Sequence, residues 1–228
     1  MLIIPPEVRV PASQLDEGVM LRLERCARIC YKSEDKMDDE YNTAFLQRIV
    51  ASGHESVIEH EKVTALFIID RGISHELVRH RIGSYSQEST RYCNYSKDKF
   101  GREISVIEPF FYSPGSLKYR LWEESCLVAE KNYLELLDQG STPQEARSIL
   151  PTCLKTEIAV TFNLREWRHF FYMRCSAAAH PQMRQVAIPL LLLFRERFQV
   201  LFDSVPYDTS FPLEHFASVY ISDDLFNL

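Results

Sequence analysis

The stretch LKTEIAVTFNLREWRHFFYMR, residues 154–174, carries two kinds of secondary structure in direct succession. Residues 154–162 are rich in β-branched and aromatic side chains, which predicts a strand. Residues 164–174 predict a helix that starts as soon as the strand ends. Because a strand passes straight into a helix, this stretch favours a fold that mixes the two kinds of element.

The sequence carries further patterns on both sides of this stretch. It predicts strands over residues 2–10, with the prolines of an edge strand, and over residues 63–69. It predicts helices over residues 19–31, 40–52, 74–81, 117–139 and 182–203. Ser74 is the expected N-cap of the third helix, and Pro189 is expected to bend the last. A capping box at Thr142–Glu145 starts a further short helix.

Residues 82–103 lack a helical pattern and are expected to form a loop with one short strand. The chain shows no internal repeat, low-complexity tract or linker. We therefore expect a single α+β domain that spans residues 1–228.

Eighteen arginines outnumber eight lysines in a chain whose formal net charge is −6. The negative charge argues against binding to nucleic acid or to an anionic membrane surface. The arginine excess indicates an anionic ligand, because a guanidinium makes bidentate contacts to phosphate and carboxylate. The seven glycines are too widely spaced for a G-x-G-x-x-G or G-x-x-x-x-G-K-[ST] phosphate loop. A nucleotide would therefore be held by side chains and helix ends.

The six cysteines form no C-x-x-C pair and no secretory segment is evident, so we expect free thiols in a cytoplasmic protein. The longest aliphatic run, residues 189–194, is far shorter than the ~20 residues that a membrane span needs. His54 and His60 are six residues apart, whereas a zinc helix places its histidines four apart on one face. We expect neither a membrane span nor a bound metal.

Residues 79–92, RHRIGSYSQESTRY, concentrate the groups that carry chemistry. Part of this cluster fits a helix C-terminus, where the macrodipole favours cations, and a solvated surface patch is the alternative interpretation. The dipole does not account for the Ser/Gln/Ser/Arg loop that follows the basic triplet. Its neutral donors and guanidinium suit a phosphate and the edge of a heterocycle. We interpret the segment as an anion site.

Arg79-His80-Arg81, followed by seven residues and Ser89, resembles the signature of the flavin-dependent thymidylate synthases. Other segments resemble the family in the same order: Gly53–Ser56 with Glu59 and His60, Glu145–Arg147, Asn163–Arg165 with His169, and Arg174 before His180–Arg184. The resemblance runs from about residue 20 to residue 205. It implies a central mixed or antiparallel sheet flanked by helices.

The resemblance also implies an activity, the reductive methylation of dUMP to dTMP. In the family, methylenetetrahydrofolate gives the carbon, and FAD reduced by NADPH gives the hydride. The family resemblance further implies a homotetramer whose active sites are shared between subunits.

Site residues follow from the resemblance position by position. Arg174 is the expected catalytic residue, since it matches the arginine that binds the uracil edge and favours its ionised form. The expected flavin-binding residues are Ser56, Arg79, His80, Arg81, Gln87, Asn163, Arg165 and His169. The expected dUMP-binding residues are Glu76, Arg79, Ser86, Gln87, Ser89, Arg91, Arg147 and Arg174. His54 is a candidate on the cofactor side.

Several positions depart from the family's common pattern. Glu76 stands where Gln is frequent, and Ser86 and Gln87 stand where Asn and Glu are frequent. Two extra residues separate Arg174 from His180 in comparison with some members.

The residue types fit a reaction without a cysteine nucleophile. Conventional thymidylate synthases activate uracil C5 by adding a thiolate to C6, whereas a guanidinium can instead stabilise an electron-rich, N3-deprotonated ring. Cys175 adjoins Arg174, but neighbouring helix residues point ~100° apart, so we interpret Cys175 as a packing thiol. Ser89 lacks a nearby base and is interpreted as a binding residue. Two rival interpretations stay open, a nucleotide-binding protein without turnover and a metal-dependent hydrolase.

Overall fold

The computed structural model describes residues 1–16, 18–97 and 100–225. Its packing divides the described chain into two compact units. Unit 1 comprises Met1–Pro6, Phe67–Arg79 and the described residues of Ser86–Ile158. Unit 2 comprises the described residues of Glu7–Leu66, His80–Tyr85 and Ala159–Leu228. Because both units are built from several separate segments, the single domain expected over residues 1–228 stays a prediction.

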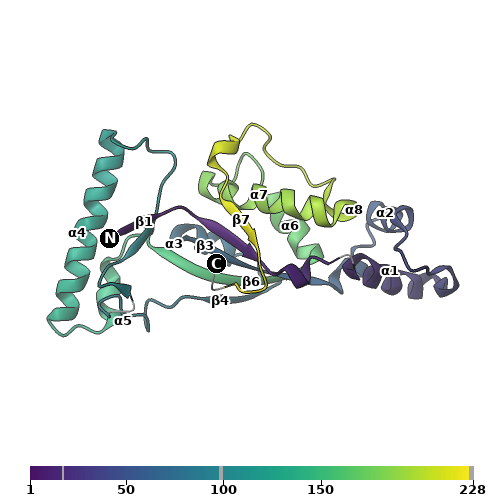
Figure 1. Cartoon of the computed structure of the whole chain (residues 1–228), viewed down its shortest axis with the longest axis horizontal. Coiled ribbons are helices and arrows are strands. Elements are labelled where there is room, and N and C mark those ends of the chain that lie inside the picture. The colour runs from purple at the N-terminus through teal and green to yellow at the C-terminus, as the bar shows by residue number, and fades with distance from the viewer. Residues whose placement is uncertain (17, 98–99, 226–228) are drawn as a thin grey trace. The chain divides into compact units, whose positions relative to one another are not determined.

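The order of elements along the chain mixes strands and helices throughout (Figure 1). The strands are β1 (Leu2–Ile4), β2 (Glu7–Val10), β3 (Lys62–Asp70), β4 (Ser84–Gln87), β5 (Ser105–Ile107), β6 (Lys155–Asn163) and β7 (Ser218–Ile221). The helices are α1 (Gly18–Tyr31), α2 (Thr43–Ala51), α3 (Arg71–Leu77), α4 (Leu117–Asp138), α5 (Pro143–Ala146), α6 (Leu164–Arg174), α7 (Pro181–Arg197) and α8 (Gln199–Phe202).

The strands form two sheets. A five-stranded mixed sheet has the order β4-β6-β3-β2-β7, and β1 pairs with β5 in a second, two-stranded sheet. β2 runs parallel to β7, with Val8 opposite Val219, and β1 runs parallel to β5, with Ile3 opposite Val106. The expected α+β class with a mixed sheet and flanking helices is confirmed.

The strand and helix predicted within residues 154–174 are confirmed, β6 beginning one residue later than predicted. Asn163 ends β6 and caps α6, because its side-chain oxygen accepts a hydrogen bond from the Glu166 N–H at 2.8 Å. This cap satisfies one of the N–H groups that the first turn of a helix leaves unpaired. The start of α6 is therefore fixed to the end of β6.

The N-terminal part of the sheet differs from the prediction. Residues 2–10 form two strands that belong to different sheets, because Pro5 and Pro6 lack the backbone N–H that a continuous strand would use in pairing. β2 is not an edge strand, since it lies between β3 and β7 in the sheet order. β7 was not predicted, and its largely exposed residues give it no buried apolar run.

Two helix boundaries also differ from the prediction. α3 begins at Arg71, because the Asp70 carboxylate caps it by accepting from the Ile73 N–H at 2.7 Å, and Ser74 is internal. α3 ends at Leu77, so the Arg79–Arg81 triplet follows the helix. The last predicted helix is divided into α7 and α8 at Phe198, whose φ of −132° and ψ of 47° are not helical.

The core of unit 2 is aromatic and holds α6 in place. Trp167 and Phe171 of α6 pack against Phe194 of α7, with ring centroids 5.3 and 5.2 Å apart. The indole N–H of Trp167 donates to the Val63 carbonyl of β3 at 3.0 Å. α7 in turn packs on β2 and β7 (Figure 1). α6 is thus a rigid support for the side chains on its other faces.

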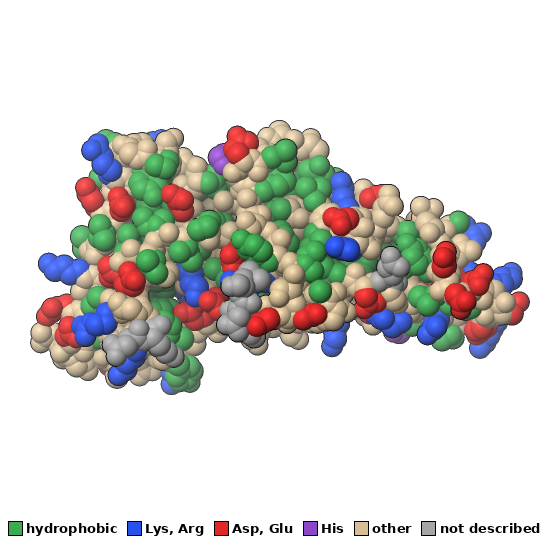
Figure 2. All heavy atoms as spheres, in the orientation of Figure 1, with side chains coloured by type: hydrophobic (Ala, Val, Ile, Leu, Met, Phe, Trp, Pro, Cys, Tyr) green, Lys and Arg blue, Asp and Glu red, His purple; other side chains and the backbone are tan. Residues whose placement is uncertain are grey.

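The longest helix of unit 1, α4, buries only a narrow stripe. Cys126 and Tyr133 lie in a core cluster with Tyr95, whereas Leu117 and Leu121 are 64% and 55% exposed. The apolar repeat at three- and four-residue spacing, which includes Leu117 and Leu121, is therefore wider than the buried stripe. Figure 2 shows exposed hydrophobic side chains interspersed with charged ones. Within the described residues, no helix has the length and apolarity needed to cross a bilayer.

Candidate active site

A buried polar cluster lies against α6 in unit 2. It consists of His80, from the segment after α3, and Glu166, His169 and Arg174 of α6. His80 and Glu166 are each 6% exposed, whereas Arg174 is half-buried and His169 is exposed. The His80 ring packs edge-on against the Phe170 ring, with centroids 5.1 Å apart. The structure thus brings together three of the residues expected at the flavin and uracil sites.

The His80 imidazole links the carboxylate of Glu166 to the guanidinium of Arg174. The Nε–H of Arg174 donates to His80 Nε2 at 3.0 Å. Because Nε2 accepts, the proton of the neutral ring lies on Nδ1. His80 Nδ1 is 3.3 Å from Glu166 Oε1, so its N–H faces the carboxylate. The three groups form one continuous hydrogen-bonded chain.

Burial sets the protonation states in this cluster. It lowers the pKa of His80 from 6.5 to about 4, and the charges of Arg174 and His169 act in the same direction. Burial also raises the pKa of Glu166, against the opposing influence of His169 and Arg165. At neutral pH His80 is therefore uncharged, in agreement with the acceptor role of Nε2.

The same cluster has the composition of a candidate metal site. Ligand atoms of His80, Glu166 and His169 lie within 4.8 Å of one another. However, the lone pair of His80 Nε2 already accepts from Arg174, and that guanidinium would repel a cation beside it. The arrangement therefore favours an anionic or electron-rich ligand over a metal ion.

A second group of expected residues lines a cavity of about 390 Å³ in unit 2. Its lining comprises Cys30, Tyr31, Ile49, Gly53, His54, Glu55, Ser56, Val57 and Arg165. The Tyr31 hydroxyl lies 2.8 Å from His54 Nδ1, and the two rings are stacked with centroids 6.4 Å apart. Arg165 is held at the cavity by Glu55 and Glu59, at 3.2 and 2.5 Å.

The lining of this cavity fits part of a flavin. Aliphatic side chains and a stacked aromatic pair suit the faces of a planar heterocycle, and a hydroxyl and a guanidinium suit its polar edge. The volume accommodates one ring system. Ser56, Arg165 and the candidate His54 are brought together here. Asn163 lies outside the lining, and its side-chain oxygen is used in the cap of α6.

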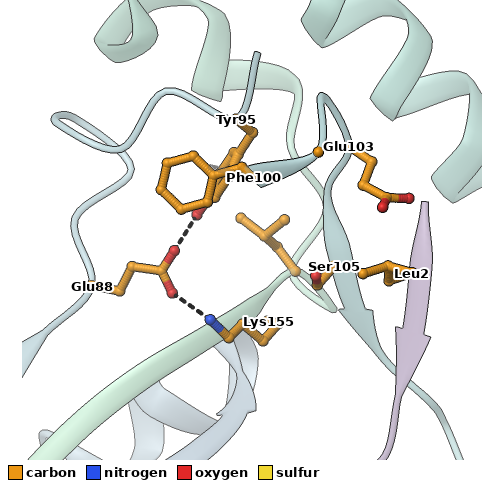
Figure 3. A pocket seen from close by; sticks show the side chains of 9 residues that line it. Leu2, Glu88, Tyr95, Phe100, Glu103, Ser105 and Lys155 are labelled. Carbon is orange, nitrogen blue, oxygen red and sulfur yellow. Dashed lines mark hydrogen bonds and ion pairs between the residues drawn. The ribbon is translucent and has the colours of Figure 1, made fainter. Parts of the chain in front are cut away.

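In unit 1, Glu88 anchors the loop that contains the expected dUMP residues. Its carboxylate accepts from the Tyr95 hydroxyl at 2.8 Å and from Lys155 Nζ at 3.2 Å (Figure 3). Its backbone N–H donates to the Glu157 carbonyl of β6 at 2.8 Å. Figure 3 shows these side chains at the wall of a cavity of about 310 Å³. Glu88 thus fixes the loop to β6 through both its side chain and its backbone.

Gln87 also has a structural task. Its amide nitrogen donates to Ser74 Oγ at 2.9 Å and to Thr156 Oγ1 at 3.2 Å. A glutamate, which is frequent in the family at this position, can only accept from such hydroxyl groups when it is ionised. These two bonds use the nitrogen of the Gln87 amide, and the expected contacts of Gln87 to both flavin and dUMP stay predictions.

Three further expected dUMP-binding residues of unit 1 are Ser89, Arg91 and Arg147. Arg91 Nε donates to Gln144 Oε1 at 3.1 Å, and its backbone N–H donates to Ser89 Oγ at 3.3 Å. Arg147 Nη1 donates to Thr90 Oγ1 at 3.4 Å. Two exposed guanidiniums and a hydroxyl thus flank one short stretch of loop, which suits a phosphate group.

The remaining expected residues lie outside these three groups. Arg79, Arg81 and Ser86 are exposed, and Glu76 is half-buried on α3. Gly83 of the same segment lies so close to Phe162 of β6 that a Cβ would come within 2.3 Å of the ring. Only glycine allows this approach, so the segment after the basic triplet is seated tightly on the sheet.

Sequence reasoning did not assign roles to Glu166, Tyr31 or Lys155. Glu166 directly follows the segment Asn163–Arg165, which resembles the family, and this position is a signal that was available. Its partner His80 is 86 positions away along the chain, and no local pattern reveals that contact.

The cysteines divide into buried and accessible thiols. Cys175 is fully buried, and burial raises the pKa of its thiol, which agrees with a packing role. Cys126 and Cys153 lie together in unit 1, with their sulfur atoms 3.4 Å apart. Cys30 is exposed and lines the cavity at His54.

Known proteins resemble this chain in sequence and in fold. The family described as "Thymidylate synthase complementing protein" matches residues 17–198. A "Flavin-dependent thymidylate synthase" of Geobacter sulfurreducens is 38% identical over 176 residues, which is 74% of this chain and 74% of that protein. Another, of Corynebacterium aurimucosum, is 35% identical over 212 residues, 83% of this chain and 82% of that protein.

A solved structure shares the fold. The UMP/dUMP methylase from Streptomyces cacaoi bound with 5-Br dUMP aligns with a TM-score of 0.70 at 22% identity. The alignment covers 89% of this chain and 96% of that one.

Proposed function

This chain belongs to the flavin-dependent thymidylate synthase family, and on that premise we propose that it methylates dUMP to dTMP. In this proposal methylenetetrahydrofolate donates the carbon, and FAD reduced by NADPH donates the hydride. The observation that carries the proposal is a half-buried guanidinium, that of Arg174, held by a buried neutral imidazole. Such a group is suited to act on a ring that becomes electron-rich.

Arg174 activates the uracil ring electrostatically. A guanidinium at the pyrimidine edge stabilises the N3-deprotonated form, and this raises the electron density at C5, where the new carbon bond forms. The charge of Arg174 also lowers the pKa of His80, so the imidazole beside it stays neutral and does not compete as a cation. No thiolate step is required in this scheme.

Ser89, Arg91 and Arg147 bind the phosphate of the substrate. Charge-assisted hydrogen bonds from two guanidiniums match the charge and geometry of a phosphate. Glu88 positions this loop through Tyr95 and Lys155. Contacts from Glu76, Arg79, Ser86 and Gln87 complete the nucleotide site in the proposal.

The flavin, when bound, supplies the reducing equivalents that convert the added carbon to a methyl group. Ser56, Arg165 and the Tyr31–His54 pair hold its ring system in the cavity of unit 2. Arg79, His80, Arg81, Gln87, Asn163 and His169 are assigned to the flavin by resemblance to the family.

The proposal includes a homotetramer with active sites shared between subunits. Leu117, Leu121 and Val128 leave an apolar face exposed on α4, at 64%, 55% and 57%, and such a face is typical of an interface. The free thiols support a cytoplasmic location. Light scattering of the purified protein tests the tetramer directly, and a stable monomer with full activity contradicts the shared site.

The decisive test of the activity is tritium release from [5-³H]dUMP with FAD, NADPH and methylenetetrahydrofolate. We expect release that requires all three additions, from a yellow protein whose flavin absorbance is bleached by NADPH. A yellow protein that binds dUMP without release would instead be a nucleotide-binding protein. A colourless protein that is activated by a divalent metal would be a hydrolase.

A further inference from the structure

We propose that Glu166 is a positioning residue that acts through His80 on Arg174. Its carboxylate holds His80 in the Nδ1–H tautomer, so that the lone pair on Nε2 orients the Arg174 guanidinium. The relevant separations are 3.3 Å from Glu166 Oε1 to His80 Nδ1 and 3.0 Å from Arg174 Nε to His80 Nε2. The consequence for catalysis rests on the proposed function, whereas the tautomer does not.

The need for Glu166 follows from the chemistry of a neutral imidazole. Either ring nitrogen can carry the single proton, and the hydrogen bond made by one nitrogen decides the state of the other. Arg174 has only donors, so a proton on His80 Nε2 would place two donors face to face and break the bond. The cluster is buried, where such a mismatch costs more than in water.

All three groups are held in fixed relation to one another. Glu166 lies in the first turn of α6 and Arg174 at its end, and Asn163 fixes the start of that helix. The His80 ring packs against Phe170 and Phe162, with centroids 5.1 and 6.2 Å away. Because a guanidinium is planar, fixing its Nε–H direction also restricts the orientation of its plane.

A purely stabilising role is a weak explanation for Glu166. Burial raises the pKa of this carboxyl, which shows that the site disfavours its charged form. Apolar replacements of buried ionic groups are often neutral or stabilising in proteins. The buried acid is better explained by what it does to His80.

Two variants of Glu166 separate its hydrogen bond from its bulk. Glu166→Met keeps the approximate volume and removes the acceptor, and Glu166→Gln keeps an acceptor oxygen. Glu24→Met is the matched control, since Glu24 is 1% exposed in unit 2 but bonds Arg28, at 2.6 Å. All proteins are loaded with FAD and used as the assembled enzyme.

The first measurement is ¹⁵N solid-state NMR of protein labelled in the histidine rings, with His80 assigned by its loss in His80→Gln. We expect a protonated Nδ1 and a bare Nε2 in wild type, Glu166→Gln and Glu24→Met. In Glu166→Met the Nδ1–H loses its acceptor while Arg174 still favours a bare Nε2, so we expect a mixture of the two tautomers, with Nε2 protonated in part of the molecules. A wild-type spectrum with Nε2 protonated at pH 7 overturns the proposal, even if no variant folds.

The second measurement is the rate of dTMP formation. We expect Glu166→Met to lower kcat about 10²-fold, with Glu166→Gln within ~10-fold of wild type and Glu24→Met unchanged among folded molecules. An altered tautomer with unchanged kcat in Glu166→Met also overturns the proposal. If wild type forms no dTMP, the proposed function fails, and the NMR result still stands or falls alone.

Discussion

Three arginines of the proposed site occupy two contrasting settings. Arg174 is half-buried, and its Nε donates to an imidazole that is 6% exposed. Arg91 and Arg147 are exposed and donate to neutral side chains, Gln144 and Thr90. A cation that acts on one edge of a ring requires a fixed direction, whereas a phosphate attracts cations from several directions. The contrast indicates which arginines work by orientation and which by charge.

The largest effect is expected at Arg174. Arg174→Lys keeps the charge and loses the planar fork, so it should lower dTMP formation ~10²–10³-fold, about 3–4 kcal/mol in the transition state. FAD content and bleaching by NADPH should be unchanged. The two half-reactions are measured separately by stopped-flow absorbance and chemical quench.

Arg195→Lys is the matched control for that experiment. Arg195 is half-buried in unit 2, and its guanidinium donates to the backbone carbonyls of Phe202 and Val205. Arg195→Lys should lower the free energy of unfolding and leave the rate of dTMP formation unchanged. A near wild-type rate in Arg174→Ala would transfer the activating role to Arg79 or Arg147.

The next effect concerns the pH dependence of stability, which follows from the neutral His80 beside Arg174. In the unfolded chain His80 binds a proton below pH 6.5, and in the folded chain only below about pH 4. Protonation therefore favours the unfolded state over this interval, and stability falls as the pH falls from 6.5 to 4. The full loss is about 3 kcal/mol.

Urea unfolding of wild type and His80→Gln at fixed protein concentration, between pH 7 and pH 4, measures this loss. Between pH 7 and pH 4, the free energy of unfolding should fall by about 3 kcal/mol less in His80→Gln than in wild type. Equal pH dependence in the two proteins would show that His80 is not held neutral in the folded state.

A smaller effect is expected when the loop that contains Ser89 and Arg91 loses the side-chain contacts of Glu88. Glu88→Leu removes the acceptor for Tyr95 and Lys155 and should weaken dUMP binding about 10-fold, or roughly 1.4 kcal/mol. Titration calorimetry measures the affinity. Glu103 lines the same cavity but lies outside the loop. Glu103→Gln should therefore leave the affinity for dUMP within ~2-fold of wild type. A similar loss in both variants would locate the effect in the cavity and not in the loop.

The smallest effect is expected for the accessible thiol. Cys30 is exposed and lines the cavity beside His54, so it is the strongest candidate for a hidden cysteine nucleophile. Cys30→Ala should retain turnover within ~2-fold, while substitutions of the buried thiols should cost ~1–3 kcal/mol in stability. Complete loss of turnover in any single cysteine variant, with the flavin still bound, would contradict activation by Arg174 alone.

The sequence predicts well what is decided locally. α6 and the capping box of α5 occur at the predicted positions, because each helix is capped by residues close together in the sequence. Asn163 bonds Glu166 at the start of α6, and Thr142 bonds Glu145 at the start of α5. α3 was misplaced by the same rule, since Asp70 and Ser74 are both able to cap and only the contact with Ile73 decides between them.

What the sequence could not predict depends on distant contacts. The apolar repeat of α4 indicates one face but not what packs against it, and Leu117, which belongs to that repeat, is exposed. β7 is a strand because β2 pairs with it, and its own residues carry little signal. The site residues came from family resemblance, while the bond of Glu166 to His80 became visible only in the structure.

In the proposed site Arg174 acts on the uracil ring, while Arg91 and Arg147 act on the phosphate. The most direct test compares the affinity for dUMP with that for deoxyuridine, which lacks the phosphate, in wild type, Arg147→Ala and Arg174→Ala. The preference for dUMP should fall at least 10-fold in Arg147→Ala, whereas Arg174→Ala should weaken both ligands equally and keep the preference. A preserved preference in Arg147→Ala, or its loss in Arg174→Ala, would contradict the division of labour between the two settings.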